Sequence, residues 1–253
     1  MEALSLKESG KALGEDDERN VADLLVDQIE FANVILISKI DLIASDEIVN
    51  LKAVLHSLNP DADIVPVVMG RVDLNKVLNT GLFDFEKAEQ APGWLKELRG
   101  EHTPETEEYG IGSFVYCARR PFHPQRFYNH LHYGEWDNGT LLRSKGFFWL
   151  ASRPDHAGSW SQAGGVMHHG LAGRWWASVP KQEWPEDSLS DIQSQWTEPF
   201  GDCRQELVFI GQNVNADVVR SELDSCLLTD AELAAGQRIW RTYPDPFPVW
   251  FAE

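Results

Sequence analysis

The stretch "ANVILISKIDLIASDE", residues 32–47, decides the fold of the first part of the chain. A run of β-forming residues ends abruptly at position 37, a polar segment follows at 38–41, and a helical pattern comes next. A buried strand that ends in polar residues just before a helix is typical of a doubly wound parallel sheet, which binds ligands at the carboxyl ends of its strands. The stretch therefore predicts an α/β domain with a ligand-facing loop at residues 38–41.

The segments around this strand extend the same pattern. Hydrophobic spacing predicts an amphipathic helix over 15–31, with Val21, Leu24, Leu25, Gln28 and Ile29 on one face. Further along we expect a helix over 46–58 capped by Ser45, a buried strand over 64–68 and a short helix near Leu74–Leu78. Two parallel strands do not make a stable sheet of this class alone. We therefore predict that residues 1–85 form only the C-terminal half of a doubly wound domain.

The pattern changes after a charged segment at 86–110, which we interpret as a linker with one helical turn. Residues 111–253 are expected to form an α+β domain with a mostly antiparallel sheet and an extended tail lying over the surface. We expect strands at 112–120, 140–152, 158–167, 173–179 and 205–213, and helices at 123–132 and 216–228 with Asn215 as the cap of the second.

Composition excludes several classes of partner. A net charge of −18 argues against a protein that binds nucleic acid through its phosphates. No stretch approaches the length of a membrane span, and the acidic N-terminal residues do not resemble a signal peptide, so we expect no membrane partner and a cytoplasmic location. The three cysteines are widely spaced, which favours free thiols over a disulfide or a cysteine-based metal site.

Ser38, Lys39 and Asp41 form the first candidate site. A carboxylate at position 41 can accept two N–H donors from the edge of guanine, and a wrong base would leave that carboxylate unpaired. GTP-binding proteins carry an Asn/Thr-Lys-x-Asp sequence of this kind. Its place between a buried strand and a capped helix favours a guanine-binding role over a chance match.

A phosphate-binding loop is missing from the sequence. The segment at 9–12, "SGKA", resembles the end of Gly-x-x-x-x-Gly-Lys-Ser/Thr, but Ser5 replaces the first glycine and Ala12 the hydroxyl residue. No catalytic residue is assigned, and without such a loop we do not expect the chain to hydrolyse GTP alone.

Three other features of the second domain each have two interpretations. His130 with His132, and His168 with His169, could bind a divalent metal or be ordinary imidazoles, and we assign no metal ligand. The tryptophans most simply pack the sheet. A cluster of basic residues could bind the acidic first part, an acidic client or a phosphate, or its members could form dispersed salt bridges. The basic residues of this cluster are Arg119, Arg120, Arg126, Arg143, Lys145 and Arg153.

Longer motifs carry a family resemblance. The segments "FVYCARRPFHPQRFYNHL", "LLRSKGFFWLASRP", "GSWSQAGG" and "DPFPVW", after the strand and Lys-x-Asp motif, resemble the CobW-like P-loop GTPases, many of which are zinc metallochaperones. The resemblance covers nearly the whole chain. It implies a GTPase domain, a CobW C-terminal domain and GTP-controlled delivery of a metal to a client protein.

By position, Ser38, Lys39 and Asp41 correspond to the guanine-specificity motif of that family, with Ser38 in place of the usual asparagine. The P-loop, switch segments, magnesium aspartate and C-x-C-C metal motif of the family would all lie before residue 1, so we expect a truncated or split chain. GTP binding is expected to be weak or lost, and zinc is a candidate cargo. The expected partners are a client metalloprotein, the missing N-terminal GTPase half or a second copy. The alternative is a nucleotide-independent module that binds a protein or a metal.

Overall fold

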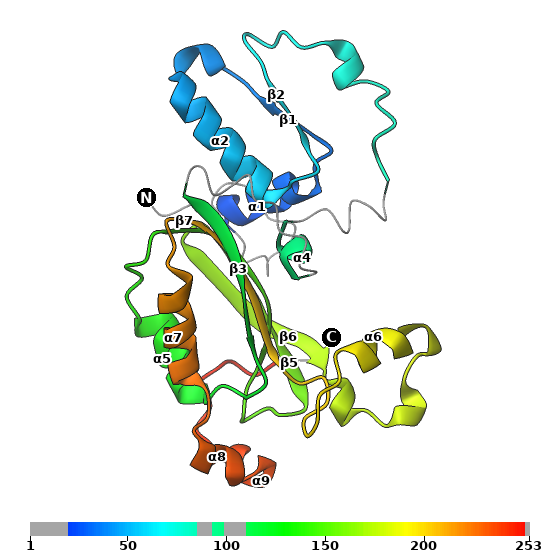
Figure 1. Ribbon diagram of the computed structural model, residues 1–253, viewed down its shortest axis with the longest axis vertical. Coiled ribbons are helices and arrows are strands. Elements are labelled where there is room, and N and C mark those ends of the chain that lie inside the picture. Colours follow the sequence, from blue (N-terminus) through cyan, green and yellow to red (C-terminus); the bar gives the residue numbers. More distant parts are fainter. Residues whose placement is uncertain (1–19, 85–92, 99–109, 251–253) are drawn as a thin grey trace.

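The computed structural model describes residues 20–84, 93–98 and 110–250, and Figure 1 shows its two parts. The first part lies above a large twisted sheet, and two helices run along one face of that sheet. Residues 15–19 of the helix predicted at 15–31, the segment at 9–12 and most of the predicted linker lie outside the described residues. Among the described residues, no helix has the length and apolar character needed to cross a bilayer.

The first part has the predicted α/β order. The strands β1 and β2 pair in parallel, from Val34 opposite Asp63 to Ile37 opposite Pro66, and confirm the two predicted strands. The elements of this part are α1 (Val21–Phe31), β1 (Val34–Ile37), a 3-10 helix (Ile40–Leu42), α2 (Ser45–Leu58), β2 (Asp63–Pro66) and a second 3-10 helix (Leu74–Lys76).

The buried face of α1 differs from the prediction. The helix buries Asp23, Val26 and Glu30, whereas Leu25 is 54% exposed. Asn20 starts the helix, since its side chain accepts the backbone N–H of Asp23 and its own N–H is accepted by that carboxylate. The buried face thus includes two acidic residues that hydrophobic spacing assigns to solvent, because basic and polar groups of the second domain lie opposite them.

The start of α2 is also one residue from its predicted place. Ser45 is the first helical residue rather than the cap, and Ala44 precedes it. The backbone N–H of Ala44 is accepted by the Glu47 carboxylate at 3.0 Å, so an acid of the first turn satisfies this end in place of a serine hydroxyl. Within the predicted linker, α4 (Gly93–Leu98) supplies the helical turn that we expected.

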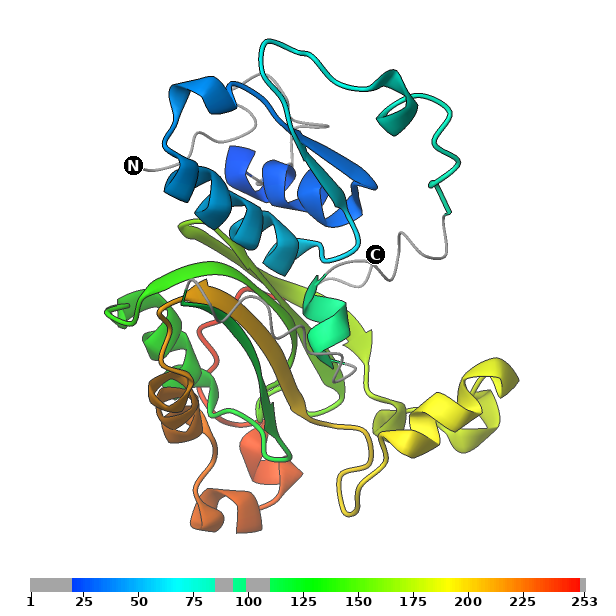
Figure 2. The same ribbon diagram turned by 45° about the horizontal axis from the view of Figure 1, so that its top comes forward.

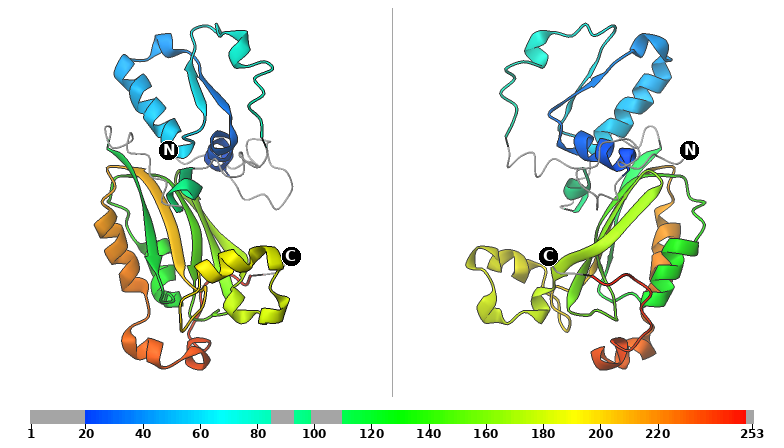
Figure 3. Two further views of the ribbon diagram at one scale, coloured as in Figure 1. Left: turned by 45° about the vertical axis from the view of Figure 1, so that its right-hand side comes forward. Right: turned by 180° about the vertical axis from the view of Figure 1, so that it is seen from behind.

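The second domain contains a five-stranded antiparallel sheet with strand order β3-β7-β4-β5-β6. Strand β7, between β3 and β4, is buried on both faces, and Figure 3 shows helices α5 and α7 on one side of the sheet and the α6 region projecting from the other end. Its strands are β3 (Ile111–Ala118), β4 (Thr140–Trp149), β5 (His156–Ala163), β6 (Val166–Arg174) and β7 (Gln205–Gln212). Its helices are α5 (Pro124–Tyr133), α6 (Leu189–Ser194), α7 (Ala216–Cys226), α8 (Asp230–Ala234) and α9 (Gln237–Trp240).

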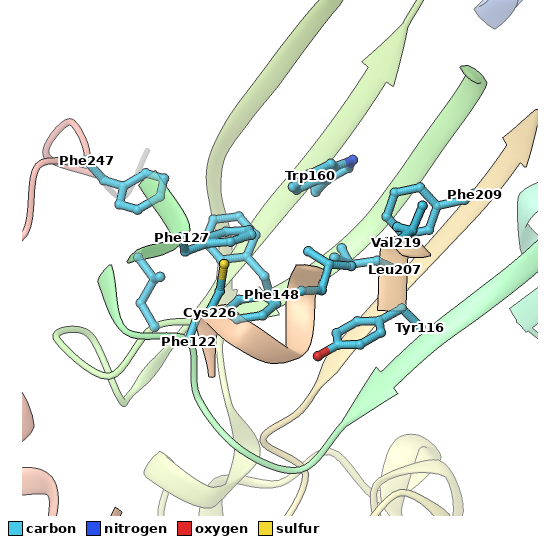
Figure 4. Packing of buried hydrophobic residues seen from close by; sticks show 12 residues of the cluster. Tyr116, Phe122, Phe127, Phe148, Trp160, Leu207, Phe209, Val219, Cys226 and Phe247 are labelled. Atoms are coloured by element: carbon cyan, nitrogen blue, oxygen red, sulfur yellow. The ribbon is translucent and has the colours of Figure 1, made fainter. Parts of the chain in front are cut away.

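Aromatic side chains fill the space between the helices and the sheet (Figure 4). Phe127 of α5 lies 4.1 Å from Phe122 and 5.9 Å from Trp160, measured between ring centroids. Gly158 has no room for a side chain, because a Cβ atom there would lie 2.4 Å from the ring of Phe148. As predicted, tryptophans pack the domain: Trp149, Trp160 and Trp175 are buried.

Two strand predictions for this domain are wrong. The strand expected at 158–167 ends at Ala163, and a turn at 164–165 leads into the next strand, Val166–Arg174. That strand ends where the one expected at 173–179 should begin, and the chain then turns through a 3-10 helix at Trp176–Ser178. The tail lies only partly over the surface: Val249 is 71% exposed, whereas Phe247 is 4% exposed and contacts Phe127, Phe148 and Tyr128. The final three residues, 251–253, lie outside the described residues.

Candidate functional site

The candidate guanine-binding loop begins where β1 ends. Ile37 is buried, whereas Ser38 and Lys39 are exposed. Lys39 has a left-handed backbone with φ 61° and ψ 31°, a conformation that non-glycine residues seldom adopt, and its carbonyl accepts the N–H of Leu42 at 3.0 Å. This sharp reversal converts an extended strand into the 3-10 helix that carries Asp41.

A second loop leaves the same edge of the sheet. The N–H of Val67 is accepted by the carbonyl of Ile37 at 2.8 Å, which keeps the ends of β1 and β2 side by side. The chain then reverses through Met69 and Gly70, both of which have positive φ, and Arg71 closes the turn on the carbonyl of Val68. Because the two strands are parallel, both loops lie at their carboxyl ends, where open α/β sheets bind ligands.

The side chains of Ser38, Lys39 and Asp41 all project from this loop into solvent. None of the three forms a hydrogen bond or ion pair with another residue of the described ranges. The structure thus places them on one short loop but does not fix their side chains against each other. A free carboxylate beside a lysine at this edge has the chemistry needed to accept N–H donors from a base.

Asn59 fixes the elements that lead into the loop. Its side chain is fully buried, and its amide nitrogen lies 2.8 Å from both the carbonyl of Ile29 and that of Ala32. These acceptors are at the end of α1, immediately before β1, where helix carbonyls have no partner within the helix. Sequence analysis missed Asn59. An asparagine just after a helix does not reveal that its side chain binds the end of another helix.

A buried ion pair joins the first part to the second domain. Arg143 of β4 is 1% exposed, and its guanidinium contacts both carboxylate oxygens of Glu30, which is 4% exposed. Next to it, His168 of β6 lies 3.2 Å from Asp23. Burial raises the pKa of Glu30, although Arg143 acts in the opposite direction. The helix that precedes β1 is therefore held against the sheet by charge as well as by apolar contacts (Figure 2).

The cluster of bases divides between two of the roles that we considered. Arg143 binds the acidic first part as one interpretation suggested, whereas Arg120, Arg126 and Arg153 form separate ion pairs with Asp230, Glu232 and Asp245 of the C-terminal segment. Burial, and then Arg143, lowers the pKa of Lys145, whose ammonium lies 4.7 Å from the ring centre of Trp94. These side chains do not form one continuous phosphate-binding face.

The histidines are distributed over several environments. His132 and His169 lie near each other, with ring centroids 6.0 Å apart, and burial followed by the charge of His132 lowers the pKa of His169. His130 faces a cavity, and His123 stacks on Tyr243. Residues 20–84, 93–98 and 110–250 contain no group of three or more His, Cys, Asp or Glu side chains that could hold a metal ion. All three cysteines are free thiols, as predicted.

Comparison with family models finds two matches. Residues 111–227 match the cobalamin synthesis protein CobW C-terminal domain. Residues 4–66 match the CobW/HypB/UreG nucleotide-binding domain, and this match includes Ser38, Lys39 and Asp41.

Two curated relatives match nearly the whole chain. The zinc-regulated GTPase metalloprotein activator 1 of Dictyostelium discoideum is 49% identical over 247 residues, which are 97% of this chain and 52% of the relative. A zinc chaperone of Mycobacterium tuberculosis is 30% identical over 246 residues, 95% of this chain and 58% of the relative. The chain thus spans about half the length of the curated relatives it matches. Among solved structures, the Zn(II)-bound YjiA GTPase from E. coli aligns with 81% of this chain and 55% of its own, at 18% identity and a TM-score of 0.37.

Proposed function

The chain belongs to the CobW family, and we propose that it is part of a GTP-binding chaperone that delivers zinc or a similar divalent metal to a client metalloprotein. The names of the relatives support this proposal, since one is a zinc-regulated GTPase activator of metalloproteins and another a zinc chaperone. In this role the metal is cargo. The described residues contain no group of three or more His, Cys, Asp or Glu side chains that could hold a metal ion. We propose that delivery involves a larger assembly that includes this chain.

The position of Asp41 at the carboxyl end of β1 is the observation that carries the proposal. Its exposed carboxylate would accept the ring N–H and the amino group of guanine, which adenine does not offer in this arrangement. The stem of Lys39 would lie along the base, as long amphipathic side chains do. Ser38 would support the loop from the end of the strand. Ser38, Lys39 and Asp41 thus form the proposed guanine-specificity site.

The proposal separates recognition of the base from hydrolysis. The sequence contains no Gly-x-x-x-x-Gly-Lys-Ser/Thr segment, which in P-loop enzymes supplies the backbone amides and lysine that hold the phosphates. We therefore expect the chain alone to bind guanine nucleotides weakly and to leave GTP intact. A partner that contributes a phosphate loop would strengthen the binding.

The first part exposes apolar surface that fits this view. Leu36 of β1 is 43% exposed, Leu42 73%, Met69 81% and Phe83 66%. Large apolar side chains in solvent mark surfaces that another protein covers. We propose that the remaining strands of a nucleotide-binding domain pack here, supplied by another polypeptide segment. Without them, we expect the isolated chain to self-associate, which sedimentation velocity at increasing protein concentration would reveal.

A nucleotide-independent role for the second domain is the second candidate. This domain has its own aromatic core and a separate cavity, and neither involves the loop at 38–41. Under this alternative the domain binds its partner equally well whether or not Asp41 is present. Comparing partner binding by the unaltered chain and by Asp41→Ala separates the two candidates.

The direct test is binding of a fluorescent guanine nucleotide to the purified chain, with unlabelled GTP, GDP and ATP as competitors. We expect GTP and GDP to displace the probe and ATP to have no effect. Asp41→Ala should abolish the binding. Asp46→Ala is the matched control, because it removes another exposed carboxylate five residues later, in the first turn of α2.

Either of two results would contradict the guanine site. Equal displacement by ATP would mean that the base is not recognised, and equal loss of binding in the Asp41 and Asp46 variants would indicate a general effect of charge. Absence of any binding at high protein concentration would leave the second domain as the functional part of the chain.

A further inference from the structure

A cavity of about 440 Å³ lies between the helical layer and the sheet of the second domain, where α5 ends and the first turns of α7 begin. Its size is within the range of sites that bind small molecules or single large side chains. None of its walls belongs to the loop at 38–41. The apolar side chains lining it include Leu141, Trp160, Met167, Phe209, Val219 and Leu223.

The rim of the cavity is acidic. Glu135 and Glu222 lie there, and neither carboxylate forms an ion pair with any residue in the described part of the chain. The carboxyl end of the ten-residue helix α5 reaches the rim at Gly134 and adds the negative end of its dipole. His130 is the only base among the described lining residues, and burial lowers its pKa, although Glu222 acts in the opposite direction.

An aromatic side chain completes the rim. Trp136 is 42% exposed, and its indole N–H donates to the carbonyl of Gly139 at 3.0 Å, which holds the ring in place. No described lysine or arginine lies over this ring, in contrast to the cation–π contacts at Trp94 and Trp250. A held aromatic face beside free carboxylates is the arrangement that recognises ammonium and guanidinium groups.

We propose that this cavity binds a basic peptide segment of a partner protein. A bulky apolar side chain of that segment occupies the cavity, and lysine or arginine residues on either side of it lie against Glu135, Glu222 and Trp136. The net charge of −18 attracts such a segment and speeds its approach. The site involves no nucleotide, so this inference stands or fails independently of guanine binding.

The methionines provide a probe of this site. The chain has only three: Met167 lines the cavity, Met69 lies 81% exposed in the first part, and Met1 is the terminal residue. The experiment titrates the full chain, labelled with ¹³C at its methionine methyl groups, with a nonapeptide in which a central tryptophan is flanked by arginines within glycine and serine. We expect the Met167 signal to shift and saturate while the Met69 signal stays in place.

Two altered peptides test the two parts of the recognition. Replacing the arginines by glutamates should abolish the saturable shift of the Met167 signal, because the rim would then repel the peptide. Replacing the tryptophan by alanine should abolish it as well, because nothing would fill the cavity.

Matched variants test the rim without altering the core. Glu135→Gln combined with Glu222→Gln should weaken peptide binding about tenfold at low salt, since two exposed charge contacts are lost. Glu183→Gln combined with Glu186→Gln changes the net charge equally at exposed positions outside the cavity, and should weaken binding less than about twofold.

Three results would overturn the proposal. The first is that the Met167 signal does not shift at about 5 mM peptide. The second is that the Met167 and Met69 signals shift together without saturation. The third is that the two double variants weaken peptide binding equally. The last two would mean that general attraction to an acidic surface explains the binding.

Discussion

The guanidinium of Arg143 donates two hydrogen bonds to the carboxylate of Glu30, one of 2.9 Å from Nε to Oε1 and one of 3.2 Å from Nη2 to Oε2. One partner belongs to the sheet of the second domain and the other to the helix that leads into β1. Such two-point pairs fix orientation as well as distance. The cost of desolvating both charges offsets much of their attraction. We therefore expect the pair to contribute more to the orientation of the two parts than to their net stability.

We expect Arg143→Ala to lower the free energy of unfolding by about 3–5 kcal/mol, because Glu30 would stay buried without its partner. Urea denaturation followed by tryptophan fluorescence measures this loss. Arg220→Ala is the control: Arg220 is 43% exposed, its partner Asp217 is 94% exposed, and its guanidinium lies 5.0 Å from the ring centre of Phe114, so the change should be below about 1.5 kcal/mol.

A combined change separates specificity from stability. Glu30→Leu together with Arg143→Met replaces the ion pair by apolar side chains, and the loss should be much smaller than the sum of the single losses. Additive losses in this double-mutant cycle would show that the two side chains are not coupled.

The lowered pKa of Glu232 predicts that the free energy of unfolding depends on pH. Its hydrogen bonds with Arg126 lower the pKa of this carboxyl from 4.5 to about 2. Because this pKa is lowered on folding, the contribution of the Glu232 carboxylate to the free energy of unfolding is complete above pH 4.5 and is lost as the pH falls towards 2. At pH 7 we expect Glu232→Gln to cost about 1 kcal/mol, since the pair is partly exposed.

Urea denaturation of both proteins at pH 7, 4 and 2.5 checks this. The difference between the unaltered protein and Glu232→Gln should shrink as the pH falls. A difference that stays constant over this range would show that the charge of Glu232 does not contribute.

Phe247 should anchor the C-terminal segment. Its ring is 4% exposed, and its centroid lies 5.9 Å from that of Phe127 and 5.1 Å from that of His169. Phe247→Ala should lower the free energy of unfolding by about 3–5 kcal/mol through loss of buried area and formation of a cavity. Val249→Ala is the control, since Val249 is 71% exposed and should change stability by less than about 0.5 kcal/mol. Equal effects of the two changes on thermal unfolding would contradict the anchoring role.

Much of the fold was predictable from local patterns. The β-forming run at 34–37 and the apolar strand after α2 pair as expected, and Pro124 and Asn215 mark the starts of α5 and α7. These signals succeed because strand propensity and capping residues act over a few neighbouring positions.

Long-range contacts explain the failures. Asp23, Val26 and Glu30 form the buried face of α1, and their spacing is regular, but hydrophobicity alone assigns the acids to solvent. Arg143 beside Glu30 and His168 beside Asp23, both more than a hundred residues later, make that burial favourable. Phe247 was likewise unpredictable, since a Pro-rich tail has no periodicity that reveals a core contact. At the candidate site, sequence supplied Ser38, Lys39 and Asp41 but could not reveal the support from Asn59.

Base specificity at Asp41 is the central claim, and saturation-transfer NMR of the full chain with GDP and xanthosine diphosphate tests it most directly. Xanthine presents a carbonyl where guanine presents an amino group, so the unaltered chain should give signal for GDP and little for xanthosine diphosphate. Asp41→Asn should reverse this preference, because the asparagine amide donates a hydrogen bond to that carbonyl. Equal signals for the two nucleotides, or a preference that Asp41→Asn leaves unchanged, would contradict a guanine-specificity site at the end of β1.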